Sequence, residues 1–157
     1  MRINFIFKDM KQEEPEYSEM IDRVKSLCEE YAACFVEIEK KERCVEIRRE
    51  LHELSVSLRG KISIDFPGLL LCLLDIYEII RDEAMLQEVL DVVSGNLEQL
   101  EVSAASVKLL AYCYYYVEEE ECAERAGKML EELKRRGVDE EELAEVGKVL
   151  EELTGNF

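Results

Sequence analysis

The apolar residues of this chain recur at intervals of three or four, and this spacing constrains the fold more than any other feature. One series runs from Tyr17 to Ile38, and a second runs from Cys44 to Leu58. A period of this length gathers the apolar side chains on one face of an α-helix. The segment Leu69–Ile80 is apolar on almost every side, which is typical of a helix buried at the centre of a domain. The spacing therefore predicts a mainly α fold.

Residues that start and stop helices divide this pattern into about seven helices. Gly60 and Gly137 follow periodic segments as C-terminal stops, and Ser103 precedes one as an N-cap. Helices joined by short turns pack as antiparallel hairpins, so we predict one helical domain across residues 1–157. The pattern leaves open whether these hairpins stack as a solenoid-like array or close into a compact bundle. The expected parts are a helical hairpin at 16–60, helix pairs at 66–136 and a C-terminal capping helix at 138–154.

Two segments, residues 34–47 and 54–66, also fit a β-strand pattern. Ile62, Ile64 and Phe66 alternate with polar residues, and apolar residues alternate in the same way within residues 1–8. We therefore expect a short two-stranded β-ribbon, formed by the N-terminus and residues 61–66. Such a ribbon is stable only when it packs against helices.

The segment around Tyr114 carries a spacing that is known from helical repeats. Leu110, Ala111, Tyr114 and Ala123 follow one another in steps of one, three and nine. This series resembles the tetratricopeptide repeat, a 34-residue pair of helices, over about residues 70–136. The resemblance implies that helix pairs stack side by side and leave a groove that binds peptides or proteins.

The balance of charge limits the kinds of partner. The chain has 37 acidic residues against 20 basic ones, a net charge of −17. Nucleic acids and anionic membranes attract clustered Lys and Arg, so we expect neither as a direct partner. A basic protein fits better. The composition, with three Gln, three Asn and one Thr, resembles that of proteins from hot environments. We see no secretion signal and no apolar run near the ~20 residues of a membrane span, and so expect a cytoplasmic protein.

The sequence offers no catalytic, metal or cofactor site. It has a single histidine, His52, and no pair of cysteines at a metal-binding spacing. Most of the six cysteines fall on apolar stripes, where a thiol packs as a small apolar group. We expect one disulfide, Cys113–Cys122, if the host lives in a hot environment. The cysteines are Cys28, Cys34, Cys44, Cys72, Cys113 and Cys122.

Two tyrosines between Ser103 and Glu118 share a face with charged residues. Lys108, Tyr112 and Tyr115 follow at helical spacing, and exposed tyrosines beside charges are typical of protein-binding surfaces. Two interpretations remain open: this face lines a groove, or another helix, such as the C-terminal one, covers it. In the groove, residues of the preceding helix lie beside the tyrosines, namely Glu78, Arg81 and Asp82.

These observations favour a non-catalytic scaffold or adaptor that binds a protein or peptide. One alternative is an acidic regulator that masks a basic nucleic-acid-binding surface of its partner. Another is a helical subunit of a larger assembly, including a homo-oligomer.

Overall fold

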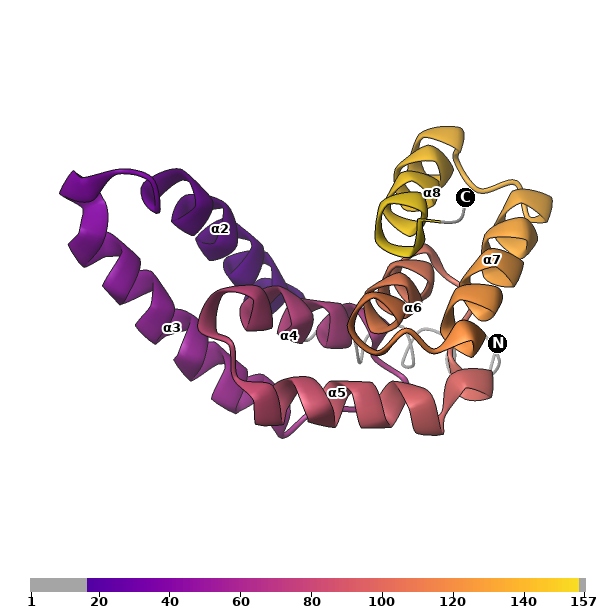
Figure 1. Ribbon diagram of the computed structural model, residues 1–157, viewed down its shortest axis with the longest axis horizontal. Helices are drawn as coiled ribbons and strands as arrows, with labels where there is room; N and C mark the ends of the chain where they lie inside the picture. Colours follow the sequence, from indigo (N-terminus) through magenta and orange to yellow (C-terminus); the bar gives the residue numbers. More distant parts are fainter. Residues whose placement is uncertain (1–16, 156–157) are drawn as a thin grey trace, which may run out of the picture.

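The computed structural model describes residues 17–155 and is mainly helical (Figure 1). This confirms the predicted fold class, and no β-strand occurs within the described range. Two short 3-10 helices, Ile38–Lys40 and Leu97–Gln99, join the longer elements. The α-helices are α2 (Ser18–Cys34), α3 (Lys41–Arg59), α4 (Pro67–Ile80), α5 (Glu83–Gly95), α6 (Ala104–Val117), α7 (Glu120–Arg135) and α8 (Glu140–Thr154).

The first hairpin, α2 and α3, reverses earlier than the apolar spacing predicts. The series that we followed to Ile38 leaves the helix after Cys34, and the chain turns through the 3-10 helix. Segments 34–47 and 54–66, which also fitted strands, contain helix and turn instead. Two bidentate ion pairs join the helices: Arg23 binds Glu50 at 2.5 and 2.8 Å, and Arg43 binds Glu30 at 2.5 and 2.7 Å.

The strand predicted at residues 61–66 is a turn. The amide of Lys61 donates to the Leu58 carbonyl at 2.9 Å, and the amide of Phe66 donates to the Ser63 carbonyl at 3.1 Å. These bonds use the backbone groups locally, so none of them pairs with another strand. The other half of the predicted ribbon, residues 1–8, lies outside the described residues.

Helix α4 is the central buried helix that the sequence predicts. Pro67 occupies its first turn, where the missing N–H costs nothing. It packs on α2, α3, α5 and α6. The residue that follows it, Arg81, adopts a left-handed conformation with φ of 55°. The next residue, Asp82, caps α5 by accepting from the Met85 amide at 3.2 Å.

The helices form two rows. Helices α2, α4, α6 and α8 contact one another in succession, so α2 and α8 lie at opposite ends of this row (Figure 1). Helix α3 packs on α2 and α4, α5 packs on α4, and α7 packs on α6 and α8. One continuous apolar core connects them.

Two consecutive helix pairs share a common layout. Helices α4 and α6 begin at residues 67 and 104, and α5 and α7 begin at residues 83 and 120, a step of 37 in both cases. Arg81 and Glu118, also 37 apart, both have φ of 55°. This step is three residues longer than the 34-residue period of tetratricopeptide repeats, and the resemblance to that family stays a prediction.

No helix in the described part of the chain has both the length and the apolar content that crossing a bilayer requires.

Candidate protein-binding surface

The tyrosine-bearing face of α6 lies in the middle of the first row of helices. Lys108, Tyr112 and Tyr115 follow one another along it, as predicted. The step of 37 residues places Asp75 and Glu78 of α4 in equivalent positions to Tyr112 and Tyr115. Helices α2 and α8 flank this part of the row. We call the set of Asp75, Glu78, Tyr112, Tyr115 and Glu152 the tyrosine–carboxylate surface.

Helix α8 covers the N-terminal part of this face. The Lys108 Nζ atom lies 3.1 Å from the Glu145 Oε1 atom of α8. Tyr112 is half-buried, and burial, followed by the charges of Asp75, Glu78 and Glu152, raises the pKa of its phenol. Of the two interpretations of this face, the covered one therefore applies to its N-terminal part and the exposed one to its C-terminal part. Lys108 and Tyr112 contact neighbouring helices, whereas Tyr115 is 56% exposed.

A cluster of rings fixes the C-terminal end of the same face. The Tyr116 hydroxyl donates to the Glu78 carboxylate, and the Tyr116 ring meets the Tyr77 ring edge-on at 5.5 Å. Burial and the bond to Glu78 raise the pKa of Tyr116. Tyr77 in turn donates to Glu83 at 2.8 Å, and the Arg81 guanidinium lies 5.3 Å from the Tyr77 ring centre. Tyr116 therefore packs against Tyr77 and also holds a carboxylate of α4 in place.

Asp82, the last of the predicted binding residues, lies in a different setting. Its carboxylate lies 3.1 Å from Arg59 of α3, besides its bond to the Met85 amide. Arg59 also binds Glu88 of α5 at 2.7 and 3.1 Å. These contacts join α3 to the start of α5, and a part for Asp82 in partner binding stays a prediction.

Sequence reasoning missed Asp75. This carboxyl is half-buried in α4, and burial raises its pKa from 3.8 to about 6, while Lys25 and Lys108 oppose the shift. The signal was present, because Asp75 is the first charged residue after the apolar run Leu69–Leu74. A lone acid within such a run is a candidate for a perturbed pKa.

The cysteines are free thiols. Burial raises the pKa of Cys28 and Cys122 to about 11 and that of Cys72 to about 12, and burial also raises the pKa of Cys113. The expected Cys113–Cys122 disulfide is not formed, although the two thiols are close enough to influence each other. Cys113 of α6 and Cys122 of α7 are both buried and pack in the apolar core of the protein.

Among residues 17–155, the large apolar side chains with the highest exposure lie where the first hairpin reverses. Phe35, Val36 and Ile38 are 68%, 78% and 80% exposed, and we call these three residues the hairpin tip. The Phe35 ring lies 5.7 Å from the Tyr31 ring of α2, which supports it from one side. Two more exposed valines, Val45 and Val56, lie singly on α3.

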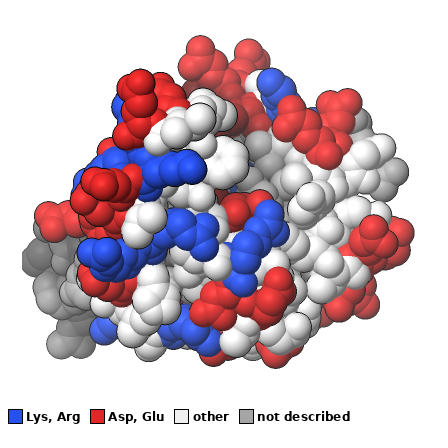
Figure 2. Space-filling model, turned by 60° about the vertical axis from the view of Figure 1, so that its left-hand side comes forward, with Lys and Arg blue, Asp and Glu red and all other residues white. Residues whose placement is uncertain are grey.

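The charged residues are distributed unevenly. Residues 18–59 contain eight Lys or Arg and ten Asp or Glu, whereas residues 60–157 contain nine and 23. Figure 2, which brings the α2–α3 side forward, shows basic and acidic side chains interleaved on that face. The excess negative charge therefore belongs to the C-terminal two-thirds of the sequence.

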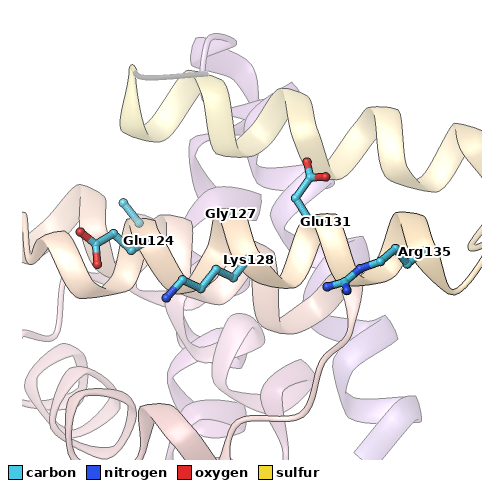
Figure 3. A pocket seen from close by; sticks show the side chains of 6 residues that line it. Glu124, Gly127, Lys128, Glu131 and Arg135 are labelled. Carbon is cyan, nitrogen blue, oxygen red and sulfur yellow. The ribbon is translucent and has the colours of Figure 1, made fainter.

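An open hollow runs along α7, and Figure 3 shows the side chains beside it. Its lining alternates acidic and basic residues and contains neither a histidine nor a thiol. No cluster of metal-binding side chains occurs among the residues that the structure describes. The residues that line the hollow are Ala123, Glu124, Gly127, Lys128, Glu131 and Arg135.

No protein-family model matches the chain, and a search of curated proteins finds no match either. Among solved structures, the chain is similar to a transcription anti-terminator antagonist, UpxZ, from Bacteroides uniformis. The TM-score is 0.62 and the sequence identity is 24%, over 87% of this chain and 92% of that one. At this level of identity, the likeness shows a shared helical fold.

Proposed function

We propose that this chain is a non-catalytic regulator that acts by binding another protein. The observation that carries the proposal is the hairpin tip. Three large apolar side chains within four residues are each more than two-thirds exposed, at the end of a hairpin whose two helices are joined by ion pairs. Isolated exposed apolar residues are ordinary, but a concentrated group on a highly charged surface marks an interaction site.

The class of partner is suggested by the structural neighbour. That protein is described as an antagonist of a transcription anti-terminator. We therefore propose that this chain binds a protein of the transcription machinery of its host and alters termination.

The buried thiols and the Tyr116 phenol support a role without catalysis. A nucleophilic cysteine needs a lowered pKa, whereas the buried thiols of Cys28, Cys72 and Cys122 have raised values. The phenol of Tyr116 is held in its protonated form by burial and by Glu78.

The experiment compares tip variants in the native host. Phe35→Ser combined with Val36→Ser and Ile38→Ser removes the three exposed apolar groups and leaves the ion pairs of the hairpin in place. The matched control is Val56→Ser, which removes an exposed apolar group from α3 away from the tip. The readouts are read-through at a terminator upstream of a reporter and co-purification of transcription proteins.

We expect overproduction of the native chain and of the control to change read-through, and the tip variant to have no effect. The same partner should co-purify with the native chain and the control alone. Unchanged read-through with all three chains, or a tip variant as active as the native chain, would contradict the proposal.

A second candidate function follows from the uneven charge. The excess of 23 acids over nine bases in residues 60–157 suits a regulator that masks a basic, nucleic-acid-binding surface of its partner. Its complex should weaken steeply as salt rises, because long-range attraction between exposed charges is screened. A complex that withstands high salt favours the apolar hairpin tip instead.

A further inference from the structure

An exposed tyrosine at the end of α6 rests on a braced set of rings. Tyr115 meets the Tyr116 ring edge-on at 5.2 Å, and more than half of Tyr115 faces solvent. Tyr116 is held in turn by its hydrogen bond to Glu78 and by the Tyr77 ring. A ring that is already positioned loses little freedom when a partner contacts it, so this end of the surface is preorganised for binding.

The carboxylate of Asp75, one turn before Glu78 on α4, lacks a direct partner. It forms no hydrogen bond and no ion pair with the described part of the chain. A half-buried carboxylate without such contacts is costly, and the raised pKa of Asp75, about 6, expresses that cost. A cation placed beside it from outside would offset the cost and form a charge-assisted hydrogen bond.

The groups that face Asp75 from the neighbouring helices do not supply this cation fully. Lys108 of α6 is already paired with Glu145 of α8 at 3.1 Å. Lys25 of α2 lies near enough to lower the pKa of Asp75, but makes no ion pair with it. Glu78 on α4 adds a second negative charge near Asp75, and it is itself paired with Arg81 at 3.6 Å.

The opposite side of the surface is also acidic. Glu152 of α8 is among the charges that raise the pKa of Tyr112, together with Asp75 and Glu78. Carboxylates from α4 and α8 therefore lie on both sides of the α6 tyrosines. A tyrosine face bordered by carboxylates attracts a cation through two interactions, a cation–π contact with the ring and a charge-assisted hydrogen bond to the carboxylate.

We propose that the tyrosine–carboxylate surface binds a basic segment of a protein partner, with one Lys or Arg side chain at Asp75 and another over the Tyr115 ring. The proposal rests on the proposed function only in taking a protein as the partner. It concerns a different surface from the hairpin tip.

The test uses a synthetic probe, because the natural partner is unidentified. The probe is a capped, alanine-based helical peptide with arginines at i,i+4 spacing, and its counterpart carries glutamine at those positions. Binding to the full chain is measured by calorimetry at physiological salt, where diffuse attraction to a chain of charge −17 is screened. Asp75→Asn and Tyr115→Ser are the test variants, and Glu141→Gln removes one equally negative, exposed charge from the first turn of α8.

We expect the arginine peptide to bind, the glutamine peptide not to bind, and Asp75→Asn to raise Kd about tenfold or more. Tyr115→Ser should weaken binding as well, whereas Glu141→Gln should leave it within about twofold. Circular dichroism checks that every variant is folded. Equal losses for Asp75→Asn and Glu141→Gln, or equal binding of both peptides, or no binding at all, would overturn the proposal.

Failure of this proposal can be told from failure of the proposed function. If the peptide test fails while the hairpin-tip variant still loses its effect on read-through, the surface proposal is wrong and the regulatory function stands. If the peptide binds as expected while the native chain has no effect on read-through, the surface proposal stands and the function is wrong.

Discussion

Replacing Glu118 by glycine should stabilise the protein, although glycine usually weakens a folded chain. Glu118 ends α6 in the left-handed conformation, with φ of 55°, and its side chain forms no hydrogen bond or ion pair with the described residues. That conformation costs a residue with a Cβ about 1–2 kcal/mol. The carboxylate also lies beside the negative end of α6, which costs about 0.3–1 kcal/mol. Replacement by glycine removes these two costs, but it also makes the unfolded chain more flexible, which lowers the stability by about 0.5–1 kcal/mol.

The balance predicts that Glu118→Gly raises the free energy of unfolding by about 1 kcal/mol, which is a Tm increase of about 2–4 °C for a domain of this size. Two variants separate the contributions. Glu118→Ala removes only the charge, so it should gain about half as much. Glu120→Gly makes the same chemical change inside the first turn of α7, where it should cost about 1 kcal/mol or more.

Thermal and urea unfolding, followed by circular dichroism, measure these differences directly. The reasoning depends on the left-handed backbone at residue 118. If Glu118→Gly is no more stable than Glu118→Ala, the strain that we assign to that position does not exist.

Further changes test the core, the helix cap and the buried carboxyl. Leu51→Ala, at a fully buried position of α3, should lower the free energy of unfolding by about 2–5 kcal/mol, whereas Val56→Ala on the exposed side should change it by less than about 0.5 kcal/mol in urea titrations. Ser103→Ala should cost about 1 kcal/mol, because the serine hydroxyl accepts from the Ser106 amide at 3.1 Å, and Ser103→Asp should largely retain stability. The folded pKa of Asp75, about 6, lies above its ordinary 3.8, so its contribution to stability is present at low pH and lost as pH rises through about 6. The free energy of unfolding of the native chain should therefore fall as the pH rises from about 4 to about 6, and that of Asp75→Asn should fall less over the same range. Identical pH profiles of the two proteins would show that the carboxyl is solvated.

The helices were predictable because the signals that define them are local. Apolar spacing fixes which side of each helix is buried, and Pro67, Ser103 and Gly137 lie at the ends where their backbone preferences place them. These effects depend on a few neighbouring residues, and therefore they can be recognised without knowledge of the fold.

The hairpin tip was not predictable for the opposite reason. Phe35 and Ile38 continue the apolar period of α2, so the sequence assigned them to its buried face. Burial, however, requires another element beside them, and the hairpin extends past the helices that cover the rest of α2. Likewise, Ile62, Ile64 and Phe66 alternate as a strand does, but their backbone bonds close within a turn.

The paired layout of α4–α5 and α6–α7 shows which positions packing does not determine. Leu69, Leu70 and Leu73 are buried in α4, and the residues 37 positions later in α6 are buried too. The remaining face differs completely, because Asp75 and Glu78 in one helix correspond to Tyr112 and Tyr115 in the other. Since the same packing tolerates carboxylates in one helix and phenols in the other, the core does not require either. Core packing therefore does not explain why a half-buried acid, Asp75, lies beside the tyrosines of α6. Recognition of a basic partner is the explanation that we propose to test.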